Sequence, residues 1–228
     1  RDTMTEIHLL DNKGEGEATA DIQLCKAHWY GGNRQQGCEN TITAVSHLLG
    51  GVPIDGYYEL NMSEIPKLNN MVDGVTVTLE DDFSKKYPKM KKGATINLDD
   101  EQAYAYVHDR YGVGNKENTS RMKRQQQYMT GFFKKLQEKV KANLNYANEV
   151  FESLQDVSTT DITIGKISNI SNIFASGTDK GIFELAGKSK IGQALGDEID
   201  HMEFYVNKKA MVSTMSELFG IVEQKNKE

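Results

Sequence analysis

The fold class is decided by residues 53–79, which read PIDGYYELNMSEIPKLNNMVDGVTVTL. Residues 54–61 follow a proline and have the aromatic and aliphatic content of a strand, whereas residues 62–71 have the pattern of a short helix. Residues 75–79 alternate β-branched and apolar side chains, as strands do. Because strands and helices alternate here, we expect an α/β fold in which helices cover a sheet.

Two shorter helices are predicted on either side of this stretch. Residues 38–49 place apolar side chains on one helical face, and a pair of glycines closes the pattern. Residues 99–107 begin with Asp99, a candidate helix cap, and Gln102 stands three positions later. This spacing predicts a capping box at the start of the second helix.

The longest helical pattern covers residues 119–148, and Thr119 or Ser120 is a candidate cap at its start. A strand over residues 202–206 and a closing helix to Phe219 follow later in the chain. We expect one domain over residues 1–228. The apolar stripe predicted for the long helix consists of Met122, Met129, Phe133, Leu136 and Val140.

The composition excludes several classes of protein. The chain has 228 residues, 38% of them hydrophobic, and only three prolines, which is typical of a globular chain rather than a disordered or fibrous one. The formal net charge of −6 argues against general binding to nucleic acid or to an anionic membrane surface. No apolar run approaches the roughly 18 residues of a membrane span, and no signal peptide is present. The chain opens at Arg1-Asp2-Thr3 without an initiator Met, so we expect an excised or processed piece.

The two cysteines, Cys25 and Cys38, are too few for a zinc site made of four cysteines. A disulfide between them would close a short loop and contribute about 3 kcal/mol in an oxidising compartment. Two free thiols are the alternative, and the sequence leaves both open. The five histidines never occur at ligand spacing such as i, i+4, so a metal held by histidines is not expected.

One segment of this acidic chain is basic. Residues 110–141 contain nine basic residues and only two acidic ones. Arg121 and Arg124 lie in the first turn of the predicted long helix, where the macrodipole disfavours a cation by about 0.3–1 kcal/mol. An anion bound by both guanidiniums and by the free N–H groups of the helix start explains this placement best. Gln125 and Tyr128 share that helical face, and Arg110 comes from the preceding segment.

Plainer interpretations apply to several of these residues. The lysines later in the long helix are typical of a solvated face, and the same surface role is the alternative for the two arginines. His108 is either a general acid or base or merely a polar side chain. Asp99, Asp100 and Glu101 are explained more simply as a helix cap with charges that complement the macrodipole than as a metal cluster.

The charged motifs resemble those of the LytR-CpsA-Psr family. The core of the resemblance is the run DDEQAYAYV at residues 99–107, followed by Arg110 and by RMKRQQQ at residues 121–127. It extends in order from residue 1 to about residue 135, and residues 202–219 are similar to the family's closing strand and helix. The other matching stretches are Arg1-Asp2-Thr3, AHWYGG at residues 27–32, PIDGY at residues 53–57 continuing to Asn61, and VDGVTV at residues 72–77.

The resemblance implies a three-layer α/β/α sandwich with a central mixed sheet covered by helices and a channel for a lipid tail. It also implies a membrane-anchored phosphotransferase on the extracytoplasmic face of the cell membrane. Such an enzyme moves a glycopolymer (wall teichoic acid, capsule or a related chain) from a polyprenyl-pyrophosphate carrier to peptidoglycan. A binding module for the lipid pyrophosphate, or a lipid pyrophosphatase without transfer activity, is the alternative.

Residue roles follow from the resemblance motif by motif. Arg1, Arg110, Arg121 and Arg124 match arginines that surround the pyrophosphate, and they are the predicted catalytic residues. Gln125 matches the glutamine of the arginine-glutamine motif and is predicted to bind substrate. His108 stands where the family has the first arginine of an arginine-x-arginine pair. It is also assigned to substrate binding, and its imidazole can make activity depend on pH.

The resemblance also implies Mg²⁺ as cofactor. The family's metal-binding aspartates occur on an early strand that would precede Arg1, as would the membrane anchor, so we expect both in a segment absent from this chain. Arginines with Mg²⁺ suffice in outline for phosphoryl transfer, which depends on positioning and on stabilisation of charge. No general base is assigned, and no role in binding nucleic acid is expected.

Overall fold

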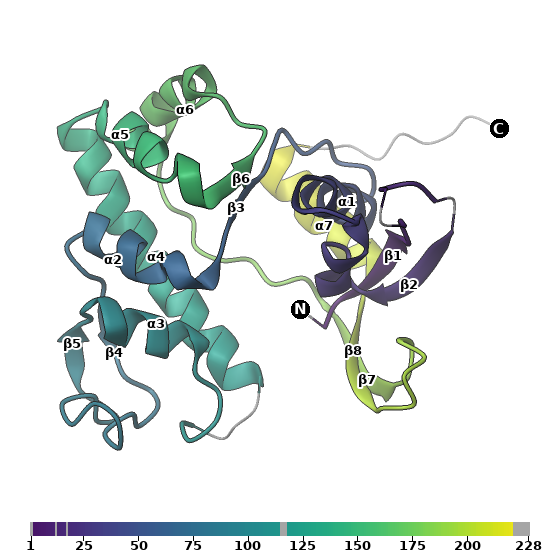
Figure 1. Cartoon of the computed structure of the whole chain (residues 1–228), viewed down its shortest axis with the longest axis horizontal. Helices are drawn as coiled ribbons and strands as arrows, with labels where there is room; N and C mark the ends of the chain where they lie inside the picture. The colour runs from purple at the N-terminus through teal and green to yellow at the C-terminus, as the bar shows by residue number, and fades with distance from the viewer. Residues whose placement is uncertain (1, 12, 17, 115–117, 221–228) are drawn as a thin grey trace. The chain divides into compact units, whose positions relative to one another are not determined.

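The computed structural model describes residues 2–11, 13–16, 18–114 and 118–220, and it confirms the α/β class (Figure 1). The chain forms two compact units. Unit 1 consists of Arg1–Glu59, Thr159–Asp161 and Phe183–Glu228, and unit 2 of Leu60–Ser158 and Ile162–Ile182. Such units occur within single domains as well as between them, so the single domain over residues 1–228 stays a prediction.

Unit 1 contains two antiparallel strand pairs. β1 (Met4–His8) pairs with β2 (Thr19–Gln23), and β7 (Gly187–Gly192) pairs with β8 (His201–Val206). A parallel bridge between Thr3 and Phe204 joins the two pairs, and the Phe204 N–H donates to the Asp2 carbonyl at 2.7 Å. The parallel and antiparallel pairing of the expected mixed sheet is therefore present in unit 1.

The described strands do not form the one continuous central sheet that was predicted. The described strands pair as four two-stranded sheets, because β1 and β8 meet at a single bridge and the strands of unit 2 are only three residues long. β3 (Tyr58–Leu60) pairs with β6 (Ser158–Thr160) where the chain passes from one unit to the other. The predicted strand over residues 54–61 is thus shorter than expected.

Helix α1 (Arg34–Leu48) packs on β1 within unit 1. It begins four residues before the predicted start because the Asn33 side chain accepts a hydrogen bond from the Gln36 N–H at 3.0 Å and caps it. Asn40 on this helix is buried and donates to the carbonyls of His8 and Ala27 at 3.0 and 2.7 Å. The buried apolar cluster of this unit is small and consists of Ile7, Ile22, Ala27 and Ala44.

The remaining described elements of unit 1 are short 3₁₀ turns and one helix. η1 (Leu24–Lys26) and η2 (Trp29–Gly31) lead into α1, and α7 (Lys208–Phe219) ends at Gly220 in the left-handed region. Cys25 is exposed and Cys38 is buried, and both are free thiols.

Unit 2 is built around two helices that follow the antiparallel pair β4 (Thr76–Thr78) and β5 (Thr95–Asn97). α3 (Asp100–His108) has the predicted capping box, in which Asp99 and Gln102 bind each other's backbone N–H. α4 (Asn118–Ala142) is the long helix, and it packs on α3 and β4. η3 (Met62–Glu64) and α2 (Ile65–Met71) replace the predicted helix over residues 62–71.

The buried face of α4 differs from the predicted apolar stripe. Met122, Met129 and Phe133 are 42%, 41% and 46% exposed, so their assignment to the core is wrong. The buried positions follow i, i+4 spacing and begin at Arg124. A search for apolar periodicity misses this face because it treats an arginine as an exposed polar residue. The buried side chains of this helix are Arg124, Tyr128, Phe132 and Val140.

The long helix also ends earlier than predicted. α4 stops at Ala142, and a turn with an asparagine on each side of Leu144 separates it from α5 (Tyr146–Ser153). η4 (Gln155–Val157) and α6 (Ile164–Ser176), which the sequence did not predict, complete unit 2. No helix within the described residues is both long enough and apolar enough to cross a membrane.

Candidate functional site

Arg124 is the buried centre of the basic segment. Its side chain is 2% exposed, its Nε lies 3.1 Å from Asp81 Oδ2 without the alignment of a hydrogen bond, and its Nη atoms donate to the carbonyls of Tyr106 and Asp109. Burial lowers the pKa of the Arg124 guanidinium, and the neighbouring Asp81 charge opposes that shift. The ion pair and the two carbonyls therefore offset the cost of burying the charge.

Aromatic rings cover the remaining faces of this guanidinium. Arg124 Cζ lies 5.1 Å from the centre of the Phe83 ring and 5.8 Å from that of Tyr106, within cation–π range. Burial raises the pKa of Tyr106 to about 12, so this phenol stays neutral. Arg124 thus fixes the start of α4 against the end of α3.

Two glutamines on α4 strengthen the same junction. Gln125 Nε2 donates to the Val107 carbonyl at 2.9 Å, and Gln127 accepts from the Tyr106 hydroxyl. The last carbonyls of a helix have no partner within it, and here side chains of α4 satisfy two carbonyls at the end of α3. The roles of Gln127 and Asp81 were missed in the sequence, although Gln127 is the last residue of the 121–127 motif and Asp81 lies two residues after the predicted strand over residues 75–79.

The other predicted residues lie around this junction. Arg121 is half-buried on the same face of α4 as Arg124, one turn earlier. Arg110 is half-buried just after α3, with its Cζ 5.6 Å from the Tyr111 ring centre. Unit 2 therefore carries Arg110, Arg121, Arg124 and Gln125 on two adjoining segments. Arg1, the remaining predicted catalytic residue, lies outside the described residues.

His108 ends α3 with its imidazole half-exposed. The ring stacks on Tyr104 with centres 4.8 Å apart, and Nδ1 lies 3.3 Å from Asp109 Oδ1. Asp109 also lies 3.8 Å from Lys86 Nζ. The imidazole of His108 is therefore accessible to solvent and has a carboxylate beside it.

A cavity of about 740 Å³ adjoins the first turns of α4. Gly114 lies at its wall with φ +55°, and a Cβ there would come within 2.7 Å of the Asp81 carboxylate, so this position requires glycine. The charged and polar side chains that line the cavity are Glu80, Asp81, Asp82, Lys92, Ser120 and Lys123.

Two carboxylates of this cavity already have partners within the protein. Asp81 is paired with Arg124, and Asp82 accepts hydrogen bonds from the backbone N–H and the hydroxyl of Ser84. Within the described residues, no three carboxylates bring their oxygens together, but Mg²⁺ is commonly held by one or two carboxylates together with substrate phosphates. Dependence on Mg²⁺, which the family resemblance implies, therefore stays a prediction.

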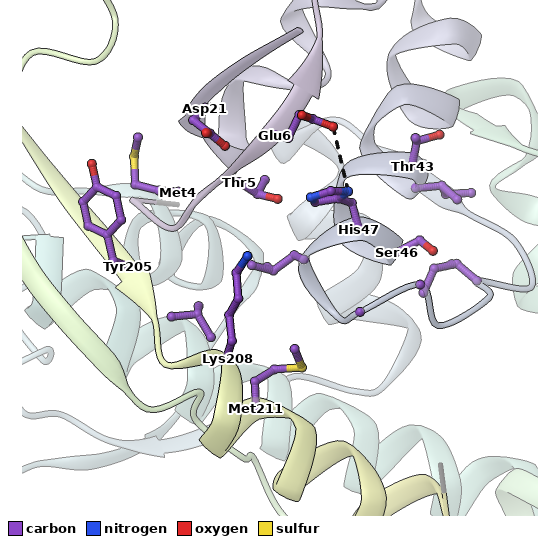
Figure 2. A pocket seen from close by; sticks show the side chains of 16 residues that line it. Met4, Thr5, Glu6, Asp21, Thr43, Ser46, His47, Tyr205, Lys208 and Met211 are labelled. Carbon is purple, nitrogen blue, oxygen red and sulfur yellow. Dashed lines mark ion pairs between the residues drawn. The ribbon is translucent and has the colours of Figure 1, made fainter. Parts of the chain in front are cut away.

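A second cavity, of about 840 Å³, lies in unit 1 among β1, α1 and the start of α7 (Figure 2). Figure 2 shows Lys208 extending into it from α7 and the ion pair of His47 with Glu6, whose atoms are 3.9 Å apart. Apolar side chains supply much of the rest of the wall, including Met4, Ile42, Leu48, Ile54, Val206 and Met211. The cavity therefore combines these apolar side chains with the polar heads of Glu6, Asp21, His47 and Lys208.

Known proteins match both the sequence and the fold. Residues 1–219 match the sequence model of the LytR_cpsA_psr family. A Bacillus subtilis structure, TagV, is 20% identical with a TM-score of 0.68, and the match covers 98% of this chain and 82% of that one. A transcriptional regulator from Enterococcus faecalis is 20% identical with a TM-score of 0.69, over 98% of this chain and 76% of the other.

A third similar structure is TagT bound to LI-WTA, which is 18% identical with a TM-score of 0.64 over 96% of this chain and 75% of that one. At these identities the structural likeness shows the fold alone. A search of curated proteins found no match.

Proposed function

The chain belongs to the LytR-CpsA-Psr family, and on this premise we propose that it transfers a cell-wall glycopolymer from a polyprenyl-pyrophosphate carrier to peptidoglycan. The observation that carries the proposal is the pair of arginines, Arg110 and Arg121, that flank the junction fixed by buried Arg124. TagT, a similar protein, has been solved with a wall teichoic acid ligand, which supports a glycopolymer as substrate.

We assign Arg110 and Arg121 to the pyrophosphate. Guanidiniums at a helix start add forked hydrogen bonds to the positive end of the macrodipole, and both stabilise phosphate oxygens. Arg1 remains a proposed third ligand on the strength of its motif. Arg124 was predicted to bind the same group, but its burial and its carbonyl and carboxylate partners support a positioning role. Gln125, bound to the end of α3, is assigned to positioning for the same reason.

The proposed reaction is an in-line displacement at phosphorus. A sugar hydroxyl of peptidoglycan attacks the phosphorus that carries the glycopolymer, and the bond from this phosphorus to the bridging oxygen breaks. Polyprenyl phosphate leaves with the electron pair, and the hydroxyl proton passes to solvent. Arg110 and Arg121 neutralise the charge that develops on the phosphate oxygens, which lowers the barrier because their positions are fixed beforehand.

His108 adjusts the charge of this site in the proposal. A protonated imidazole would add a cation beside Arg110, and the neutral form would not. In this role the imidazole makes transfer depend on pH, and transfer should be faster when the ring is protonated. A His108→Arg variant should remove this part of the pH dependence, because an arginine keeps its charge throughout.

The remaining parts of the proposal rest on the family resemblance. They are dependence on Mg²⁺, attachment to the membrane and location at its extracytoplasmic face. No step of the reaction is assigned to Mg²⁺. The cavity of unit 1 is a proposed site for part of the lipid tail, supported by the apolar side chains of its lining.

A transfer assay tests the proposal. The purified chain is mixed with a short polyprenyl-pyrophosphate-linked saccharide and peptidoglycan fragments, with and without Mg²⁺. We expect acceptor-dependent release of polyprenyl phosphate, and an Arg121→Ala variant should lower kcat/KM by about 10²–10³-fold, the usual cost of one oxyanion donor. Lys134→Ala, an exposed cation on the same helix, is the matched control and should change the rate little.

Other results would point elsewhere. Release of polyprenyl phosphate without any acceptor would indicate a pyrophosphatase. Tight binding of the carrier lipid without release would indicate a binding module. Equal rates for Arg121→Ala and Lys134→Ala would reject the assignment of the anion site to the start of α4.

A further inference from the structure

Three side chains with metal-binding atoms meet in unit 1, whereas Arg110, Arg121 and Arg124 belong to unit 2. The three are His28, just before η2, Cys38 on α1 and Glu59 on β3. Their ligand atoms all lie within 4.8 Å of one another. Nε2 of the histidine is 3.9 Å from Glu59 Oε1, and Sγ of the cysteine is 4.0 Å from Glu59 Oε2.

Two glycines bring the histidine to the cysteine. A Cβ on Gly37 would lie 2.7 Å from the His28 carbonyl oxygen and 3.0 Å from its ring, and a Cβ on Gly31 would lie 2.1 Å from Gly37 Cα. The loop that carries His28 therefore packs directly on the backbone of α1. Since Cys38 is the next residue on that helix, the close approach sets the imidazole beside the thiol.

The carboxylate of Glu59 is held in place from its other side. Arg34 donates to Oε2 from Nε at 3.1 Å, and its Nη2 lies 3.0 Å from the same oxygen. The Thr159 hydroxyl makes a further hydrogen bond to this carboxylate. The acidic ligand is thus oriented before any ion arrives, which lowers the cost of binding.

Nε2 of His28 has no hydrogen-bond partner among the described residues. Although 42% of the imidazole is exposed, this nitrogen is shielded from solvent. Cys38 is 4% exposed. A buried polar atom without a partner is costly, and an ion shared with the thiol and the carboxylate would remove that cost.

We propose that His28, Cys38 and Glu59 bind one zinc ion. Zinc takes nitrogen, sulfur and oxygen ligands together at bond lengths of about 2.0–2.3 Å, which places ligand atoms about 3.3–3.8 Å apart in a tetrahedron. Side-chain rotations would bring the observed separations, 3.9 and 4.0 Å for two pairs and at most 4.8 Å for all three, to that geometry. The thiol proton passes to solvent when sulfur binds, and water fills the fourth position.

Mg²⁺ does not suit these ligands, because it prefers oxygen ligands in octahedral geometry. The ion proposed here therefore differs from the family's implied cofactor, and binding at this site needs neither carrier lipid nor acceptor. Its effect would be to join the loop that carries His28, α1 and β3 within unit 1.

Metal titration of the whole chain tests the proposal. The chain is stripped with EDTA, kept reduced and titrated with Zn²⁺ by calorimetry and with Co²⁺ by absorption. We expect one ion per chain, a sulfur-to-cobalt charge-transfer band, and a rise in Tm with Zn²⁺ because the ion binds the folded state. Cys38→Ser should abolish the charge-transfer band and weaken Zn²⁺ binding at least about 100-fold, whereas Cys25→Ser, at the exposed thiol, should change neither.

A second variant keeps the test decisive if the buried cysteine cannot be replaced without unfolding. His28→Gln alters a half-exposed side chain, so the fold should survive, yet it should weaken Zn²⁺ binding while circular dichroism stays unchanged. Failure of the wild-type chain to bind one Zn²⁺ would overturn the proposal. Unchanged binding in folded Cys38→Ser or His28→Gln would overturn it equally.

Discussion

The two units of the chain hold their functional side chains in opposite ways. Unit 2 has a large buried cluster on which α3 and α4 rest, whereas that of unit 1 has only four members. In unit 1, buried polar groups also join segments: Asn40 on α1 donates to the carbonyls of His8 and Ala27. The buried residues of the larger cluster are Val72, Val75, Val77, Leu79, Phe83, Met90, Leu98, Ala103, Tyr106, Val107, Tyr128 and Phe132.

The comparison shows what each unit tolerates. Apolar burial is non-directional, so unit 2 can fix a charged helix start with one buried ion pair at its edge. A unit held by directional hydrogen bonds loses more when a single polar partner is removed. Three substitutions test this contrast, ordered by the size of the expected effect.

The largest effect is expected at the buried charge of unit 2. The Asp81 side chain is only 12% exposed, and Arg124→Ala removes its ion-pair partner. The substitution also removes the donor to the carbonyls of Tyr106 and Asp109. Breaking a buried ion pair in this way costs about 3–5 kcal/mol of unfolding free energy. Urea denaturation followed by circular dichroism measures it.

Arg121→Ala is the matched control, because it removes the same type of side chain one turn away. We expect it to cost less than about 1 kcal/mol of stability while lowering transfer steeply. If both variants lost activity with equal, small changes in stability, Arg124 would act on the substrate directly. The proposed difference between Arg124, which positions the helix, and Arg121, which binds substrate, would then be wrong.

An intermediate effect is expected at the polar clamp of unit 1. Asn40→Ala removes the side-chain donor from the carbonyls of His8 and Ala27, and an unsatisfied buried group costs about 1–3 kcal/mol. Hydrogen exchange should quicken in β1 and α1 and stay unchanged in α4. Equal acceleration in both units would show that their stabilities are not separable by this means.

The smallest effect concerns pH and the β7–β8 pair. Hydrogen bonds from the Tyr205 hydroxyl and the Ala194 N–H lower the pKa of Glu203, so its ionised form stabilises the folded state above the ordinary value of 4.5. That contribution is lost as the pH falls through the lowered pKa. The difference in Tm between wild type and Glu203→Gln should therefore shrink between about pH 6 and pH 3. A constant difference across this range would mean that the carboxylate contributes by packing alone.

Local signals in the sequence predicted most of the elements near the arginines. The capping box at Asp99 and the strand within residues 75–79 depend on neighbouring residues, and both are confirmed. α6 was missed because its serines and asparagines weaken a periodic apolar pattern, although it has Ile164, Ile167, Ile170 and Ile173. Gln137 on α4 donates to carbonyls at the end of α6, and no pattern of neighbouring residues in the sequence predicts this contact.

The candidate sites were predicted less well than the fold, because their contacts join distant segments. The helix-dipole reasoning identified Arg121 and Arg124 as unusual but could not separate them, since only the structure brings Asp81 to one of them. The cluster of His28, Cys38 and Glu59 has no recognisable ligand spacing either, since glycine packing creates it. For each arginine, the predicted role in binding substrate stays a prediction.

The bridge between Thr3 and Phe204 has a consequence for the order of folding. Unit 2 is formed from residues 60–158 and 162–182, so all of its chain is synthesised before β8 exists. β1 meets its parallel neighbour only after a loop of nearly the whole chain has closed, and such long-range pairing forms slowly. A nascent chain that emerges N-terminus first can thus complete unit 2 while β1, although paired with β2, still lacks its parallel neighbour.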